Sequence, residues 1–327
     1  SYQSAFSQIG MQINDCRTFK DWAQVYDKIV YWETELQKNG VEGMEEVVQM
    51  QKSSANTEFT KFIKNHYKDW FHGDEHRPLM VHQVMKQRVL PMADKEKVLL
   101  VIIDNLRLDQ YRMLKPLFSQ IYDIEHEEII SSILPTATQY ARNALFAGLM
   151  PSEIEKLYPD LWLNDEDEGG KNQHEEELLR KTLKRFGKNY KWFYEKILNQ
   201  AHGQKVKEKA GRIPEHQLSV LVYNFVDMLS HARTEMDVIK ELANDEAAYR
   251  SLTISWFEHS NLFEVLKLTS EKGIKVIITT DHGSVRINNP VKVIGDRKTT
   301  TNLRYKHGRN LNYNSKEVFE ITHPNDV

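Results

Sequence analysis

The feature that most constrains the fold is a series of short apolar runs in the part of the chain that follows Pro91. The run KVLLVII at 97–103 is rich in β-branched side chains, which is typical of a strand buried on both faces of a parallel sheet. Helical stretches such as 245–273 separate these runs. The pattern predicts an α/β domain with a mostly parallel sheet and helices on both faces. The expected strands are 97–103, 128–134, 217–226, 274–280 and 291–294.

The first 75 residues have a different pattern, with apolar side chains at helical spacing. One helix is expected to begin after an N-cap at Thr18 and to end near Gly40. Its apolar stripe consists of Trp22, Val25, Tyr26, Ile29 and Trp32. We therefore expect a helical bundle over 1–75, acting as a connector or interaction module, followed by the α/β domain over 76–327.

The composition of the 327 residues excludes several classes of protein. The single cysteine, Cys16, allows neither an intrachain disulfide nor a thiolate metal site. No apolar run approaches the ~18 residues that span a bilayer, and the chain does not open on a secretory signal. The net charge of −3 argues against a dedicated duplex-DNA binder. We expect a cytoplasmic protein with no membrane partner.

Three of the expected strands run into side chains that ligate metals. Asp104 follows the first of them, and Asp281 and His282 follow the fourth. Asp227 and His231 come after the third strand and are four residues apart, so a helical turn would put both on one face. In open α/β sheets, ligands bind at the carboxyl ends of the strands. Carboxylates and imidazoles suit zinc, and a set of this kind fits two metals on either side of a phosphoryl group.

Another expected strand, 128–134, is followed by two threonines at the start of an expected helix. A threonine hydroxyl is a weak nucleophile unless a metal activates it, and a helix N-terminus favours a bound anion. Thr136 also fits a capping box, because Gln139 lies three residues on. The residue pattern alone leaves open whether Thr136 or Thr138 is the reactive one.

The segments VIIDNLR, LPTAT…AGLMP, VDMLSH and TTDHG, in this order, resemble the alkaline phosphatase superfamily and, within it, the PglZ domain. Together with the preceding bundle, the chain is similar to the response regulators of the type IX secretion system. The resemblance implies a zinc-dependent phosphodiesterase or phosphatase with two zinc ions. It also implies the output region of a two-component regulator, with a sensor kinase and a sigma factor as partners and a homodimer upon phosphorylation.

The resemblance also assigns roles to individual residues. Thr138, three residues after Pro135, would be the nucleophile and would contact the first zinc. That zinc would be held by Asp104, Asp281 and His282, and the second zinc by Asp227 and His231. The family takes the third ligand of the second zinc from a His-Gly-Gly turn, which this sequence lacks, and His307 in YKHGRN does not match that pattern. The receiver domain and the closing strands of such regulators are also missing, so we expect a fragment or a chain with further ends.

The substrate class rests on three basic stretches, at 180–191, 205–212 and 296–310. Lys and Arg interleaved with aromatic residues suit short single-stranded or cyclic oligonucleotides, although the same residues suit a solvated surface. The alternative function is a regulatory module for dimerisation and sigma-factor binding, with little catalysis. A scaffold has no use for a nucleophile that faces metal ligands, so the sequence favours an enzyme. A phosphomutase shares the metal motifs, but no sugar-specific signal is present.

Overall fold

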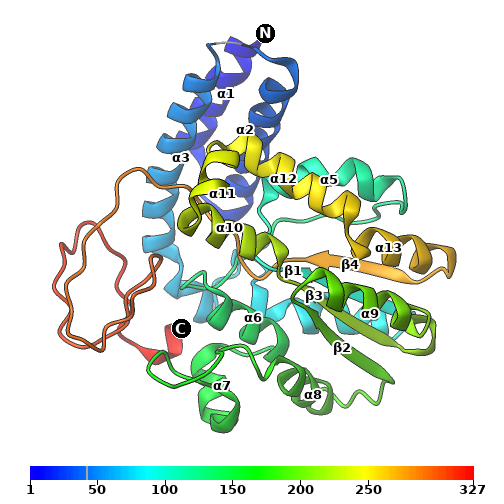
Figure 1. Ribbon diagram of the computed structural model, residues 1–327. Coiled ribbons are helices and arrows are strands. Elements are labelled where there is room, and N and C mark those ends of the chain that lie inside the picture. Colours follow the sequence, from blue (N-terminus) through cyan, green and yellow to red (C-terminus); the bar gives the residue numbers. More distant parts are fainter. Residues whose placement is uncertain (42) are drawn as a thin grey trace. The chain divides into compact units, whose positions relative to one another are not determined.

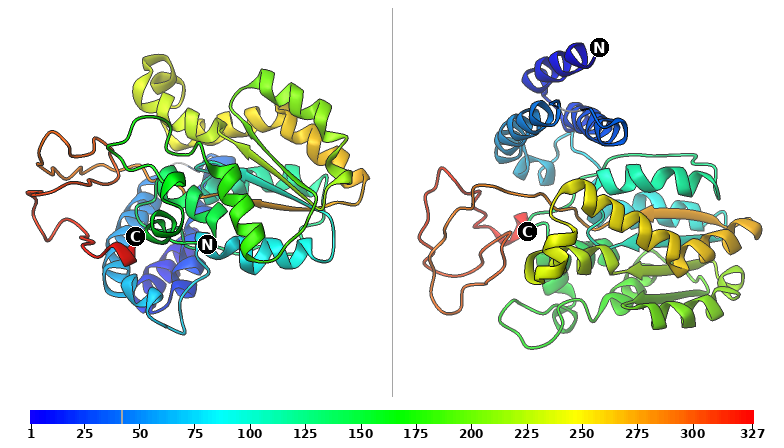
Figure 2. Two further views of the ribbon diagram at one scale, coloured as in Figure 1. Left: turned by 90° about the horizontal axis from the view of Figure 1, so that it is seen from below. Right: turned by 45° about the horizontal axis from the view of Figure 1, so that its top comes forward.

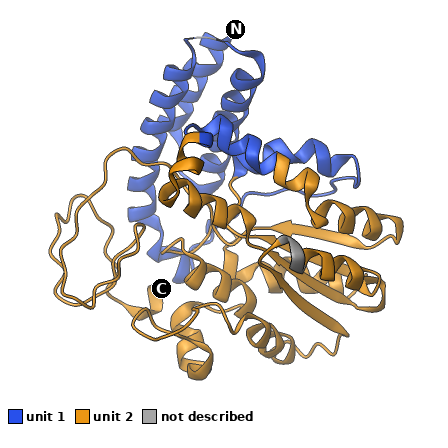
Figure 3. Ribbon diagram, in the orientation of Figure 1, with its two compact units in different colours: residues 1–78, 108–130, 242–254 blue, residues 79–107, 131–241, 255–327 orange. Residues whose placement is uncertain are grey.

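The computed structural model describes residues 1–41 and 43–327, apart from the side chains of 200–202, and this part of the chain forms two compact units (Figure 3). Each unit draws on segments that are far apart in the sequence. Unit 1 comprises residues 1–78, 108–130 and 242–254. Unit 2 comprises residues 79–107, 131–241 and 255–327.

Unit 1 is helical. Helices α1 (Tyr2–Asp15), α2 (Phe19–Asn39) and α3 (Glu45–His66) pack against one another, and α5 (Leu108–Ser119) packs against α2 (Figure 1). Helix α2 begins after Thr18, as predicted, because Thr18 and Asp21 form a capping box. It ends at Gly40, whose left-handed φ of 58° suits a residue without a side chain. Of the predicted stripe, Trp22, Val25 and Ile29 are buried and Tyr26 is exposed.

A buried ion-pair network ties a late segment of the chain into unit 1. Arg250, on α12 (Glu246–His259), is 3% exposed. Its guanidinium lies 3.1 Å from Asp109 Oδ2 and 3.4 Å from Glu33 Oε1, and it also donates to the side chain of Gln37. A buried arginine needs such partners, because an unpaired charge would be costly.

Unit 2 contains a four-stranded, fully parallel sheet in the order β2-β3-β1-β4. The strands are β1 (Val98–Ile103), β2 (Trp192–Ile197), β3 (Leu218–Tyr223) and β4 (Lys275–Thr279). Every residue of the central strands β1 and β3 is buried, in agreement with their continuous apolar sequences. Since the strands are parallel and in register, the residues after β1, β3 and β4 emerge at one edge of the sheet.

Helices cover both faces of this sheet, as the sequence predicts. The connection from β1 to β2 runs in one direction along the sheet, and those from β2 to β3 and from β3 to β4 run in the other. Right-handed crossovers therefore place their helices on opposite faces. Figure 2 shows α9 and α13 on one face and α6 and α8 on the other, and each pair packs together. These helices are α6 (Thr138–Ala147), α8 (Glu175–Arg185), α9 (Gln200–Ala210) and α13 (Asn261–Glu271).

Shorter elements complete the chain. The remaining α-helices are α4 (Leu90–Ala93), α7 (Pro151–Leu157), α10 (Phe225–Glu235) and α11 (Asp237–Leu242). Single turns of helix lie at η1 (Lys68–Phe71), η2 (Val81–Gln83), η3 (Met85–Val89), η4 (Pro159–Leu161), η5 (Ile213–Glu215) and η6 (Pro324–Asp326). In the described part of the chain, no helix has both the length and the apolar character that a bilayer span requires.

Two of the expected strands are wrong. The segment 128–134 forms only an isolated bridge at Ser131, and the hydroxyls of Ser131 and Ser132 bond to backbone carbonyls instead of leaving an apolar face. The segment 291–294 likewise forms a single bridge, at Ile294, whose side chain is 55% exposed. The sequence reading also missed β2, an edge strand of aromatic and charged residues that is mostly half-buried. Without a continuous apolar run it gave no strand signal.

Candidate metal centre and nucleophile

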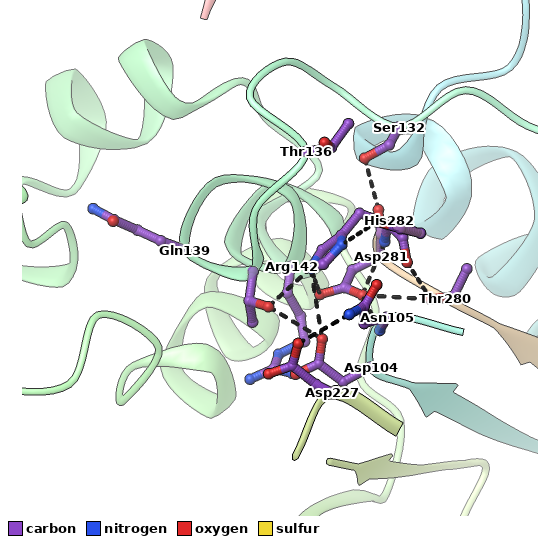
Figure 4. Close-up of polar contacts among 12 residues, drawn as sticks. Asp104, Asn105, Ser132, Thr136, Gln139, Arg142, Asp227, Thr280, Asp281 and His282 are labelled. Atoms are coloured by element: carbon purple, nitrogen blue, oxygen red, sulfur yellow. Dashed lines mark hydrogen bonds and ion pairs between the residues drawn. The ribbon is translucent and has the colours of Figure 1, made fainter. Parts of the chain in front are cut away.

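Asp104, Asp281 and His282 converge at the carboxyl edge of the sheet (Figure 4). Asp104 follows β1, and Asp281 and His282 follow β4, its direct neighbour in the sheet. One potential ligand atom from each residue lies within 4.8 Å of the other two. All three are buried, with exposed fractions of 1%, 1% and 3%. We refer to these three residues as the ligand cluster.

The hydroxyl of Thr138 faces the ligand cluster. Its Oγ1 lies 3.1 Å from Asp104 Oδ1 and 3.0 Å from His282 Nε2. Thr138 is the first residue of α6, and Ala137 occupies the N-cap position. The positive end of the helix dipole therefore lies behind this hydroxyl, where it favours an anion.

Thr136 does not act as the helix cap, so that expectation is wrong. The helix begins two residues later, and the side chain of Gln139 donates to the carbonyl of Leu163 (2.9 Å), whereas in a capping box it would accept from the backbone N–H of Thr136. Figure 4 draws no contact between Thr136 and the ligand cluster. The two threonines therefore have different surroundings, although they are two residues apart.

Asp227 and His231 form a separate group, the outer pair, on helix α10. They are four residues apart on one face, as predicted, with His231 Nε2 3.5 Å from Asp227 Oδ2. The Asp227 side chain is 20% exposed and that of His231 is 67% exposed. Within the described residues, no third His, Cys, Asp or Glu completes a metal-sized group with them. His307 lies instead 3.7 Å from Asp165 and is largely exposed.

The crowded carboxylates perturb one another. Burial, together with the neighbouring charge of Asp281, raises the pKa of Asp104 to about 6. Burial and the charge of Asp104 also raise the pKa of Asp227. Perturbed carboxylates at a sheet edge are typical of functional sites, although structural ion pairs also produce them.

A buried arginine orients Asp104. Arg142 Nη1 lies 2.6 Å from Asp104 Oδ2, and its Nε donates to Glu175, which also accepts from Tyr194. Burial opposes the charge of Arg142, but the carboxylates of Glu175 and Asp104 outweigh this and raise its pKa. Because Arg142 occupies Oδ2, the other oxygen of Asp104 is left facing Thr138. Sequence reasoning missed Arg142, although its position four residues after Thr138 on one helix face was a usable signal.

His282 is held by its second ring nitrogen. Nδ1 lies 2.9 Å from the carbonyl oxygen of Gly283 and 2.8 Å from Nη1 of Arg304. Donation from Nδ1–H to the carbonyl leaves the Nε2 lone pair facing the ligand cluster, whereas acceptance from Arg304 places the proton on Nε2; a metal ligand requires the first arrangement. Arg304, from the basic stretch 296–310, donates to the same carbonyl (2.9 Å) and to the carbonyl of Thr136. This stretch therefore lies beside the candidate site.

The residues of the ligand cluster fit a metal ion. Two carboxylates and one imidazole are a donor set that zinc accepts, and catalytic zinc sites keep a fourth position open. Asp281 Oδ2 is buried and has no hydrogen-bond partner among the described residues, which is costly for a carboxylate oxygen. A cation at this position would satisfy that oxygen and relieve the repulsion between the two aspartates. The fold and the donor set together define a parallel α/β domain with a metal-type site at its strand ends.

Comparison with protein families agrees with this class. Residues 84–327 match the model described as the BREX system PglZ alkaline phosphatase-like domain. The chain therefore belongs to the PglZ alkaline phosphatase-like family, and the resemblance noted in the sequence is confirmed. Residues 1–71 match the PorX response regulator linker domain. No curated protein matches the chain.

Proposed function

We propose that this protein is a zinc-dependent phosphodiesterase that forms the output region of a response regulator. The observation that carries the proposal is the position of the Thr138 hydroxyl, which lies within 3.1 Å of two members of the ligand cluster. A hydroxyl used only for helix capping would face its own backbone instead. Membership of an alkaline phosphatase-like family supports hydrolysis of a phosphate ester.

In the proposed reaction, separate residues would bind the metal, attack the phosphorus and stabilise the phosphoryl oxygens. Asp104, Asp281 and His282 would hold a zinc ion, which supplies charge stabilisation and lowers the pKa of a nearby hydroxyl when bound. Thr138 Oγ1 would form a bond to phosphorus while the ester oxygen of the leaving group departs with the bonding electrons. Water would then form a bond to the same phosphorus and give a proton to Thr138 Oγ1 as the bond between them breaks, which releases a phosphate monoester and restores the threonine. The N-terminus of α6 would stabilise the phosphoryl oxygens throughout.

Short single-stranded or cyclic oligonucleotides are the proposed substrates. Support comes from Arg304, which lies beside His282 in the basic stretch 296–310, where a cation would attract a phosphodiester backbone. The stretches at 180–191 and 205–212 add further positive charge to unit 2. The attraction would be electrostatic, so it should weaken as salt is raised.

A second candidate function follows from the match of residues 1–71 to the PorX linker domain. Under this proposal the chain controls type IX secretion through phosphorylation-dependent homodimers, a sensor kinase and a sigma factor. The two candidates are compatible, because a regulator can carry a hydrolase as its output. The hydrolase requires the Thr138 hydroxyl for catalysis, whereas the regulatory module does not.

The test compares Thr138→Val with Thr136→Val in the zinc-loaded full-length protein. Valine keeps the shape of threonine and removes its oxygen. Thr138→Val should reduce hydrolysis of a chromogenic phosphodiester and of a short oligonucleotide by at least ~100-fold, the scale of losing a key catalytic group. Thr136→Val is the matched control and should retain activity. Full activity in both variants, with zinc still bound, would refute Thr138 as the nucleophile and indicate that water attacks phosphorus directly. Zinc-loaded wild-type protein that hydrolyses neither substrate would favour the regulatory module.

A further inference from the structure

Asn105 lies between the ligand cluster and the outer pair and is fully buried, with an exposed fraction of 0% (Figure 4). Its backbone N–H donates to Asp281 Oδ1 (3.2 Å). Its side-chain Nδ2 donates to Asp227 Oδ1 (3.2 Å). Because it is also bonded to Asp104 in the chain, Asn105 touches both groups of candidate ligands at once.

The backbone of Asn105 makes this double contact possible. Its φ of 59° is left-handed, a conformation that few residues with a side chain adopt and that asparagine tolerates. The turn after β1 thus directs the Asn105 N–H to the loop after β4. The next residue continues the link, since the N–H of Leu106 donates to Thr280 Oγ1 (3.1 Å). Glycine would satisfy this backbone equally well, but it has no group that reaches Asp227.

The outer pair needs such a partner more than the ligand cluster does. Asp227 sits on a helix rather than directly at a strand end, and its helical neighbour His231 is mostly exposed. The negative charge of Asp104 also repels the Asp227 carboxylate. Without the amide of Asn105, the Asp227 side chain would be free to turn towards solvent.

We propose that Asn105 is a positioning residue that couples the two metal subsites by holding Asp227 in place. Its side-chain amide donates to Asp227 Oδ1, so that Oδ2 remains beside His231 as a ligand for a second metal ion. The Asn105 oxygen has no hydrogen-bond partner among the described residues, so Asp227 is the side-chain partner that the structure gives this amide. The inference rests on the proposed metal-dependent function and names a residue that determines the second subsite.

Zinc titration by calorimetry on Asn105→Gly tests the inference. Glycine keeps the left-handed backbone and removes only the amide. Loss of a residue that orients a ligand typically lowers metal affinity by about 10- to 100-fold. We expect this loss at the outer pair, with the affinity of the ligand cluster unchanged within error. Asp227→Ala and Asp281→Ala identify which binding event belongs to which group.

Asn310→Gly is the matched control, because Asn310 also has a left-handed φ, of 54°, and lies on an exposed loop. It should leave both affinities unchanged. In an Asp227→Ala background, Asn105→Gly should cause no further loss, since its partner is absent. These results would support the proposed role of Asn105.

Four results would overturn the inference. Two of them, an Asn105→Gly variant that keeps both affinities and one that loses both equally, leave the proposed hydrolase intact. In the third, wild-type protein binds one zinc that Asp281→Ala abolishes and Asp227→Ala retains, so Asp227 holds no metal to be positioned. In the fourth, wild-type protein binds no zinc, which overturns the proposed metal-dependent function as well.

Discussion

The ligand cluster and the outer pair consist of the same residue types but differ in how the fold holds them. Asp104 directly follows β1, Asp281 and His282 come shortly after the neighbouring parallel strand β4, and all three are at most 3% exposed. The side chains of Asp227 and His231 are 20% and 67% exposed on a helix. The sheet thus fixes the first group through its backbone, whereas the second depends on side-chain contacts.

The two groups also differ in their electrostatic support. Asp104 is paired with a buried arginine, Arg142, which in turn is paired with Glu175. Asp227 has a neutral amide, that of Asn105, and an exposed histidine. Asp/His motifs that look alike in a sequence can therefore give sites that the fold holds with different rigidity. It predicts that the ligand cluster binds metal more tightly than the outer pair.

The largest expected effect comes from removing the support of the ligand cluster. Arg142→Met should lower the free energy of unfolding by about 3–5 kcal/mol, because it leaves the buried carboxylates of Asp104 and Glu175 without their partner. His231→Ala, at the outer pair, should change it by less than about 0.5 kcal/mol, as at other exposed positions. Urea denaturation measures both. Equal changes in the free energy of unfolding would contradict the proposed difference between the ligand cluster and the outer pair.

A smaller effect is expected on metal affinity. Asp281→Ala removes a buried charged ligand and should weaken zinc binding at the ligand cluster by at least ~100-fold, beyond the range typical of outer-shell residues. His231→Ala should weaken binding at the outer pair by only about 10-fold, because an exposed imidazole is poorly fixed. Competition with a zinc-binding dye measures both affinities. A greater loss in His231→Ala would reverse the predicted order.

Much of the fold could be predicted from the sequence because its central strands are buried on both faces. Continuous apolar runs located β1, β3 and β4 to within a few residues, and the capping box at Thr18 located the start of α2. The edge strand β2 lacked such a run. The apolar residues of 128–134 suggested a strand, but Ser131 and Ser132 between them bond to backbone carbonyls in a loop. Burial leaves a clear pattern in a sequence, whereas edge pairing depends on partners distant in the chain.

The candidate site could be predicted only in part, for a similar reason. Asp104, Asp281 and His282 were identified because each directly follows an apolar run, and the structure brings them together. Arg142 could have been found from its position four residues after Thr138, but its contact with Asp104 joins residues far apart in the sequence. Asn105 acts through a contact with Asp227, which is also far away in the sequence, so local spacing did not mark it. The roles of Thr138, of the ligand cluster and of the outer pair stay predictions until metal binding and hydrolysis are measured.

The central claim is that Asp104, Asp281 and His282 form a metal centre facing Thr138. The most direct measurement is a crystal structure of zinc-soaked protein, with data collected on both sides of the zinc absorption edge. We predict an anomalous peak about 2.0–2.2 Å from the two carboxylates and from His282 Nε2, with the Thr138 hydroxyl directed towards it. No peak at these three residues, or a peak only at Asp227 and His231, would contradict the account.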